Sequence, residues 1–128
     1  MAREKILVID DEEVIQSFMK KALSEAGYEV DGALSGEEAV QKVKLKKYDL
    51  IFVDSVMSGM DGAQTCKAIK AINPEAVLIF MTGKFDGKVS QREVEFAHAG
   101  GQVCYLYKPL DEQEILEVAS QALSAKAK

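Results

Sequence analysis

The sequence predicts an α/β domain with a doubly wound, five-stranded parallel sheet and five helices. Two observations carry this prediction: short apolar runs recur along the chain, and longer segments with helical apolar spacing lie between them. Continuous runs of β-branched and aromatic residues suit strands that are buried on both faces. Each parallel crossover then places a helix on one face of the sheet.

The five strands are expected at the apolar runs, of which the second is the weakest. These runs are Ile6–Ile9, Tyr28–Val30, Leu50–Val53, Ala76–Met81 and Val103–Tyr107.

The first helix is expected over residues 13–26, because its apolar residues recur on one helical face. That face consists of Ile15, Met19, Ala22, Leu23 and Ala26. Gly27 follows at the position of a helix C-cap. The second helix is expected to begin at Ser35, where Ser35 and Glu38 match a capping box, and to bury Ala39 and Val43.

The remaining helices are bounded by turn residues. One is expected over residues 62–72, with Asp61 as a turn or cap residue before it and Asn73-Pro74 after it. Another is expected over residues 89–99, before Gly100-Gly101. The last begins near Asp111, in a second box-like start, and carries its apolar residues inward: Ile115, Ala119, Ala122 and Leu123.

Length and composition predict a single domain over residues 1–128, with 48% apolar and 29% charged residues. The net charge of -5 argues against a nucleic-acid binder, which needs a surplus of basic residues on one face. No apolar run approaches the length of a membrane span, and the N-terminus lacks signal-peptide features, so we expect a cytoplasmic location. The two cysteines, Cys66 and Cys104, have no metal or redox spacing and are interpreted as buried apolar groups.

Chemistry is predicted where the strands end. Asp10 and Asp11 follow the first run, Asp54 follows the third, Thr82 the fourth and Lys108 the fifth. In an open α/β sheet the carboxyl ends of the strands form the ligand-binding edge. One aspartate at a strand end is unremarkable, but carboxylates at two ends with a hydroxyl and an ammonium at two others form a coherent set.

The expected chemistry is phosphorylation of an aspartate. Crowded carboxylates repel one another unless a cation joins them, and a hard, oxygen-seeking Mg2+ suits the set. Asp54 can then attack phosphorus and form an acyl phosphate. Lys108 supplies positive charge to the phosphoryl oxygens and Thr82 a hydroxyl donor.

Four motifs carry a resemblance that covers nearly the whole chain. They are Ile6-Leu-Val-Ile-Asp-Asp-Glu12, Asp54-Ser-Val-Met-Ser-Gly-Met-Asp-Gly62, Met81-Thr-Gly83 and Tyr105-Leu-Tyr-Lys-Pro109. With these motifs the chain resembles the receiver domain of bacterial two-component response regulators, of the chemotaxis-regulator type. The resemblance implies a flavodoxin-like strand order, 2-1-3-4-5. It also implies that Asp54 is the phosphoacceptor and that Asp10, Asp11, Asp54 and the backbone carbonyl of Val56 hold Mg2+.

The same resemblance assigns a switch and its partners. Thr82 senses the phosphoryl group, Lys108 contacts it through a chain with a cis Lys108-Pro109 bond, and Tyr105 rotates inward when Thr82 moves. The phosphodonor is a sensor histidine kinase or a histidine phosphotransfer protein. The output is a changed surface on the fourth helix, fifth strand and fifth helix, read by a downstream protein or output domain. The same surface forms homodimers on activation in some members of the family, and the sequence does not decide whether this domain does so.

Two departures from the family pattern stand out. Ser58 occupies a position where Pro is usual, which removes a stiffening residue from the loop but no catalytic atom. The stretch Gly83–Ser90 is longer than usual, and it is interpreted as a tolerated surface insertion or as a contact for a particular partner.

Several residues have ordinary structural interpretations. Glu12 suits the positive end of the first helix, and the lone His98 makes no metal site. A group of lysines is interpreted as a solvated helix face: Lys42, Lys44, Lys46 and Lys47.

Two other functions fit part of the sequence pattern. A phosphorylation-independent interaction module with this fold is the alternative, although such modules lose an acidic residue or the Lys, and this chain keeps them. A phosphohydrolase would place a second acid two residues after its nucleophile, where this chain has Val56. We therefore expect no enzyme acting on external substrates. The cognate kinase, the pathway and whether the domain stands alone are open at this point.

Overall fold

The computed structural model describes residues 3–54, 57, 59–82, 105–107 and 111–127. In chain order the elements are β1 (Lys5–Ile9), α1 (Glu13–Glu25), β2 (Glu29–Ala33), α2 (Gly36–Leu45), β3 (Leu50–Asp54), α3 (Gly62–Ile72), β4 (Leu78–Thr82), β5 (Tyr105–Tyr107) and α5 (Glu112–Ala127). The helix predicted over residues 89–99 lies outside the described residues.

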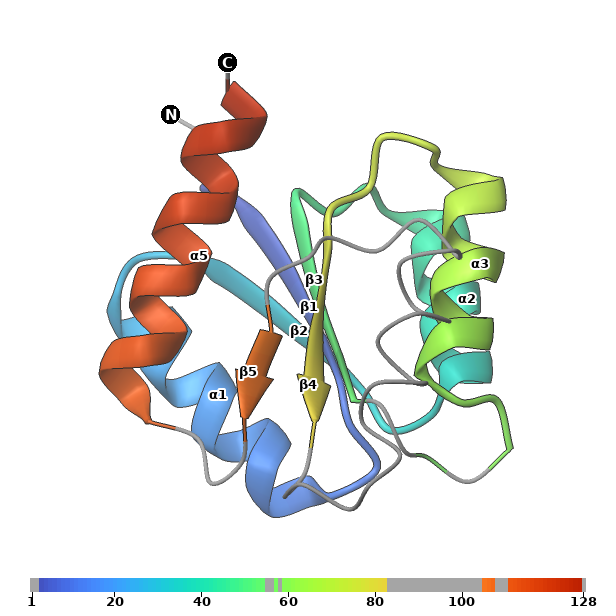
Figure 1. Cartoon of the computed structure of the whole chain (residues 1–128), viewed down its shortest axis with the longest axis horizontal. Helices are drawn as coiled ribbons and strands as arrows, with labels where there is room; N and C mark the ends of the chain where they lie inside the picture. The colour runs from blue at the N-terminus through green and yellow to red at the C-terminus, as the bar shows by residue number, and fades with distance from the viewer. Residues whose placement is uncertain (1–2, 55–56, 58, 83–104, 108–110, 128) are drawn as a thin grey trace.

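The strands form one parallel sheet in the order β2-β1-β3-β4-β5, the order that the family resemblance implies. Helices α1 and α5 cover one face of the sheet, and α2 and α3 cover the other (Figure 1). The doubly wound α/β class is therefore confirmed.

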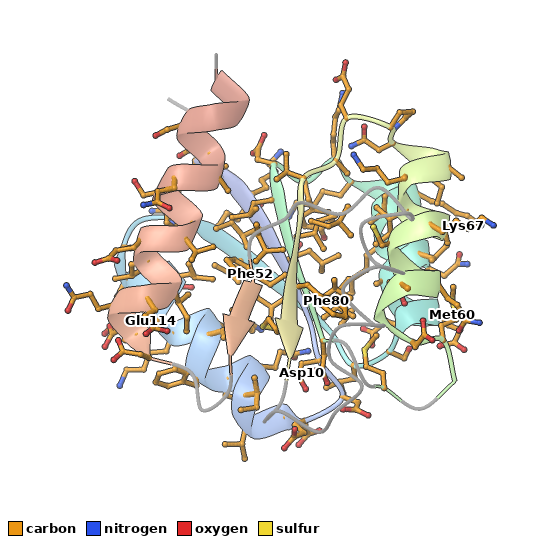
Figure 2. All side chains as sticks on the ribbon, viewed as in Figure 1. Asp10, Phe52, Met60, Lys67, Phe80 and Glu114 are labelled. Carbon is orange, nitrogen blue, oxygen red and sulfur yellow. The ribbon has the colours of Figure 1, made fainter. Side chains whose placement is uncertain are left out.

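Both faces of the central strands are buried. On β1, Ile6 and Val8 pack toward α1 and α5, while Leu7 and Ile9 pack toward α2 and α3. All four side chains are fully buried, because successive residues of a strand point to opposite faces. The two phenylalanines labelled in Figure 2 divide in the same way, Phe52 into the α1/α5 layer and Phe80 into the α2/α3 layer.

Helix α1 ends in a hydrogen-bonding pattern that explains one wrong prediction. Ala26 was expected on the buried face, but it is the C-cap residue and is exposed. Gly27 follows with φ 101° and donates to the Ser24 carbonyl at 3.0 Å. The Tyr28 amide donates to the Leu23 carbonyl at 3.2 Å, which completes a Schellman motif. The chain has left the helix at Ala26, so the helical spacing no longer decides where its side chain points.

The predicted starts of α2, α3 and α5 are found, with one difference in detail in α2. The Ser35 hydroxyl accepts from the Glu38 amide at 3.0 Å, but the Glu38 carboxylate accepts from the Leu34 amide at 2.9 Å rather than from Ser35. Asp61 caps α3 in a complete capping box with Gln64. In α5, Ile115 and Ala119 are fully buried, as the apolar spacing predicts.

Strand β2 is longer than the sequence predicts, and it carries polar residues. We expected Tyr28–Val30, whereas β2 continues through Asp31 and Gly32 to Ala33, in register with β1 up to Ile9. The polar residues are tolerated because β2 is an edge strand whose side chains are only partly buried before Ala33. A prediction from apolar composition alone therefore underestimates the length of this strand.

Strand β2 is bound by polar residues in the last part of α2 and just after it. Lys46 Nζ lies 2.6 Å from a Glu29 carboxylate oxygen and 2.9 Å from Asp31 Oδ2. The Tyr48 hydroxyl donates to the same Asp31 oxygen at 2.7 Å. Lys42 donates to the Gly32 carbonyl. The prediction that the lysine group is only a solvated helix face is therefore wrong for Lys42 and Lys46, which join α2 to the sheet edge.

The other boundaries differ by one or two residues. Asp54 and Thr82 were expected to follow their strands, and each is instead the last residue of its strand.

Cys66 is fully buried, as predicted, and burial raises its thiol pKa to about 11. Within the described residues, no helix combines the length and the apolar character needed to span a membrane.

Burial predicts a contrast between two leucines. Leu23 is fully buried in the α1/α5 layer, whereas Leu45 at the end of α2 is 89% exposed. We expect Leu23→Ala to lower the free energy of unfolding by about 2–5 kcal/mol and Leu45→Ala to change it by about 0.5 kcal/mol or less. Urea unfolding followed by circular dichroism measures both, and equal losses would contradict the assignment of the core.

The β2 edge network predicts a pH dependence. Partial burial alone would raise the pKa of Asp31, but the hydrogen bonds from Tyr48 and Lys46 and the charges of Lys46 and Lys42 outweigh it and hold this pKa below its usual value. A lowered carboxyl pKa stabilises the fold above the unfolded-state pKa, and that contribution is lost as pH falls through the folded-state pKa.

We therefore expect Tyr48→Phe to cost about 1 kcal/mol of unfolding free energy at pH 7, since the hydrogen bond to a charged acceptor is partly exposed to solvent. The difference from the parent should begin to shrink below about pH 4, the pKa of Asp in the unfolded chain, and should disappear as pH falls through the lower folded-state pKa of Asp31. Urea unfolding across pH 3–7 measures it. Tyr28→Phe is the control, because the Tyr28 hydroxyl has no hydrogen bond within the described part of the chain. A Tyr48→Phe effect independent of pH would contradict this account.

Candidate functional site

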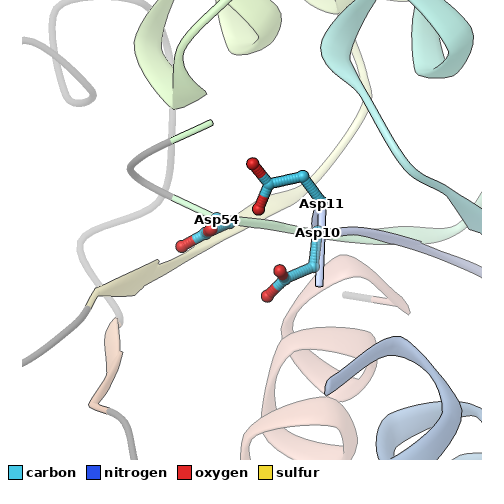
Figure 3. A group of neighbouring side chains, drawn as sticks. All are labelled: Asp10, Asp11 and Asp54. Carbon is cyan, nitrogen blue, oxygen red and sulfur yellow. The ribbon is translucent and has the colours of Figure 1, made fainter. Parts of the chain in front are cut away.

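Three aspartates meet at the carboxyl edge of the sheet. Asp10 and Asp11 directly follow β1, and Asp54 ends β3, the neighbouring strand. One carboxylate oxygen from each lies within 4.8 Å of the others (Figure 3). Asp10 is fully buried and Asp54 is 4% exposed, whereas Asp11 is exposed. We call these three residues the acidic cluster.

The backbone around Asp10 is tightly held. Its amide donates to the Ala33 carbonyl at 3.1 Å, which extends the β1–β2 ladder by one residue. Its carboxylate accepts from the Glu12 amide at 2.9 Å, in a turn of the kind that Asp favours. Glu12 is the N-cap residue of α1, in agreement with its predicted place at the helix N-terminus. Asp10 therefore shapes the turn from β1 into α1 as well as contributing to the acidic cluster.

Sequence reasoning missed Gln16, which supports this turn from α1. Its side-chain amide donates to the Ala33 carbonyl at 2.8 Å, the same oxygen that accepts from the Asp10 amide. Gly32 makes room for it, since a Cβ there would overlap the Gln16 side chain. The only signal in the sequence is a glycine inside a strand, which often marks a close approach of another group.

The other predicted site residues are placed only in part. Thr82 ends β4 at the same edge of the sheet, but its side chain is outside the described residues. Tyr105 begins β5, paired in register with Phe80, and its side chain is likewise outside them. Val56 and Lys108 lie outside the described residues altogether, as do Ser58, Gly83–Ser90, the Lys108-Pro109 bond, His98 and Cys104.

The acidic cluster suits a small, hard cation. It offers three carboxylates, which are the ligand type that Mg2+ prefers, and two of them are withdrawn from bulk water. Negative charges at this spacing repel one another, and a divalent cation offsets that repulsion. Because only a few protein ligands converge, the set fits an ion that keeps waters of its own better than one that needs a full cage of protein oxygens.

Comparison with protein families identifies the domain. Residues 6–120 match the response regulator receiver domain. The chain belongs to this family. The resemblance stated from the four sequence motifs is therefore confirmed, and with it the place of the domain in two-component systems.

Relatives and solved structures agree with this assignment. The chain is 29% identical to the sporulation initiation phosphotransferase F of Bacillus subtilis, over 99% of both chains. It is 37% identical to the transcriptional regulatory protein ZraR of Salmonella typhimurium, over 93% of this chain. A CheY-like receiver domain protein from Methanospirillum hungatei has a TM-score of 0.91 at 25% identity, with 98% of each chain covered.

The relatives differ in length. The match covers 26% of the ZraR protein but 99% of the sporulation phosphotransferase. Receiver domains of this kind therefore occur both within longer regulators and by themselves.

Repulsion within the acidic cluster predicts a stabilising substitution. Without divalent cations, Asp11→Asn should raise the free energy of unfolding by about 1 kcal/mol, the low end of the Coulomb range, because Asp11 is exposed and screened by solvent. The measurement is urea unfolding in EDTA at low salt. Glu13→Gln is the matched control, since it removes one exposed negative charge nearby but outside the cluster, and it should not stabilise. A Glu13→Gln gain equal to that of Asp11→Asn would point to net charge instead.

Proposed function

We propose that this domain is a phosphorylation-dependent signalling switch in which Asp54 accepts a phosphoryl group. The observation that carries the proposal is the acidic cluster, in which Asp54 lies within 4.8 Å of Asp10 and Asp11 at the carboxyl edge of a receiver domain. The similarity to a protein named as a phosphotransferase supports the same chemistry.

Asp54 has the position that a nucleophile needs. It ends β3, a fully buried strand between β1 and β4; Asp54 pairs in register with Met81 of β4, and the preceding Val53 pairs with Ile9 of β1. Its carboxylate is almost entirely buried but lies beside the exposed Asp11, at the edge of the molecule. A nucleophile fixed in this way meets its substrate in a restricted set of orientations, which lowers the entropic cost of reaction.

Asp10, Asp11 and Asp54 would hold Mg2+, with the Val56 carbonyl as a further ligand. When bound, the ion neutralises part of the charge on the carboxylates and on the phosphoryl oxygens. The buried pair Asp10 and Asp54 would provide the fixed ligands and Asp11 the one nearest solvent.

The proposed transfer breaks the bond between phosphorus and a donor histidine nitrogen and forms a bond from phosphorus to a carboxylate oxygen of Asp54. The nitrogen keeps the electron pair of the broken bond, and no further reactant is required. Lys108 would contact the phosphoryl oxygens and Thr82 would donate its hydroxyl to them. Both roles come from the family resemblance and from the places of these residues at or after strand ends.

The proposed switch runs through neighbouring strands. Thr82 pairs in register with Tyr107, and Phe80 pairs with Tyr105, so the backbones of Thr82 and Tyr105 lie on adjacent strands two positions apart. A movement of Thr82 toward the phosphoryl group would leave space for the Tyr105 ring. The surface altered in this way would include β5 and α5, and a downstream protein or output domain would read it.

The phosphodonor would be a sensor histidine kinase or a histidine phosphotransfer protein. Such a partner must reach the edge where Asp54 lies, and α1 begins there. Val14, in the first turn of α1, is 79% exposed, and Phe18, one turn later, is 39% exposed. These apolar side chains lie on one helix face and offer contact area to a partner beside the acidic cluster.

We propose a switch rather than an enzyme for external substrates. The residue two positions after Asp54 is Val56, which cannot transfer protons. Hydrolysis would then be limited to the domain's own acyl phosphate.

The deciding experiment is intact mass spectrometry after incubation with acetyl phosphate, with and without Mg2+. We expect one phosphoryl adduct that needs Mg2+ and that is absent from Asp54→Ala. Glu13→Gln is the control, since it removes an exposed negative charge near the acidic cluster but outside it, and it should keep the adduct. A folded parent that acquires no adduct in the presence of Mg2+ would refute the proposal and favour a phosphorylation-independent interaction module.

A further inference from the structure

The first turn of α2 packs against the loop that leads from Asp54 to α3. Gly36, the first residue of α2, is buried. A Cβ at this position would overlap the Thr65 hydroxyl and lie 2.9 Å from Met60 Cβ. Thr65 is itself fully buried, and its hydroxyl donates to the Asp61 carbonyl at 2.8 Å. Only a glycine permits α2 to approach the start of α3 this closely.

A second contact lies one residue later on α2 and one residue earlier on the loop. Gly59 has φ 77°, a conformation that favours glycine, and a Cβ there would lie 2.8 Å from Glu37 Oε2. The Glu37 carboxylate therefore covers the loop at Gly59. Gly36 and Glu37, which are consecutive in α2, thus meet the loop at Met60 and Gly59, and a glycine makes room for the other segment in each contact.

The loop has further anchors on both sides of these contacts. Met57 is only 7% exposed and belongs to the α2/α3 core layer. Asp61 caps α3, with reciprocal hydrogen bonds of 2.8 and 3.0 Å to Gln64. Contacts with α2 and α3 therefore hold the described part of the loop, in addition to the conformational preferences of its own residues.

We propose that Gly36 and Glu37 are positioning residues for the phosphoacceptor site. They act by confining the loop that follows Asp54, which carries the expected Val56 ligand. This inference rests on the proposed function.

The first test is Gly36→Ala. Alanine has a higher helix propensity than glycine, so the substitution should not destabilise α2 itself. Any loss of Mg2+ affinity then comes from the altered contact with the loop. We expect Mg2+ affinity, measured by titration calorimetry, to fall about 10- to 100-fold, as when a residue that supports metal ligands is changed. The rate of phosphorylation by acetyl phosphate should fall at subsaturating Mg2+ and recover in part at saturation. Gly36→Ala/Thr65→Ala, which removes the overlapping hydroxyl, should restore part of the affinity.

Controls separate positioning from stability. Leu23→Ala lowers stability from the opposite face of the sheet, and Thr65→Ala alone removes the hydroxyl without adding a methyl. Leu23→Ala should keep Mg2+ affinity near that of the parent, and Thr65→Ala, which loses a hydrogen bond to the Asp61 carbonyl, should weaken it less than Gly36→Ala does. If Leu23→Ala weakens Mg2+ binding as much as Gly36→Ala does, the effect follows stability and the proposal is wrong.

The second test uses the exposed Glu37, where folding is not at risk. Glu37→Gln keeps the shape over Gly59 and should bind Mg2+ nearly as the parent does, whereas Glu37→Ala uncovers the loop and should weaken binding. Glu38→Gln is the control for charge, because Glu38 is one residue away and accepts instead from the Leu34 amide. Equal Mg2+ affinities for the parent, Glu37→Ala and Glu37→Gln would overturn the role of Glu37. This test does not depend on whether Gly36→Ala folds. Mg2+ binding is read without phosphorylation, so a parent that binds Mg2+ but acquires no phosphoryl group refutes the proposed function alone.

Discussion

Burial of the parallel sheet on both faces is the constraint on which the rest of this structure depends. Helices α1 and α5 cover one face and α2 and α3 the other, and each apolar strand runs through the interior in the same direction. All carboxyl ends then meet at one edge, where the polar residues that leave the core gather. Asp10, Asp11 and Asp54 come together because β1 and β3 are neighbours in this arrangement.

The same arrangement accounts for the chemical character of the site. Burial withdraws Asp10 and Asp54 from water and leaves the charges on the three carboxylates to repel one another at short range. The proposed cation would offset this repulsion. Binding of a cation and acceptance of a phosphoryl group use the same negative charge, which explains why one edge would serve both purposes.

Support for the site extends beyond the acidic cluster. Gln16 and Gly32 hold the turn at Asp10 from one side, while Gly36 and Glu37 meet the loop beyond Asp54 from the other. At the β2 edge, Lys46 and Tyr48 bind polar side chains that would otherwise weaken the strand. These residues carry no family motif, yet they connect the helices on each face with the strands whose ends form the site.

The sequence by itself determined the fold class, most helix boundaries and the identity of the acidic residues, because apolar periodicity and capping residues act locally. It also predicted the family from motifs that stand in order along the chain. Only the tertiary structure decided the length of β2, the exposure of Ala26 and the contacts of Lys46, since each depends on a neighbour distant in the sequence. The approach of α2 to the loop after Asp54 belongs to the same class. A glycine such as Gly36 shows in sequence only that a side chain is absent, and the packing of α2 on α3 shows what that absence makes room for.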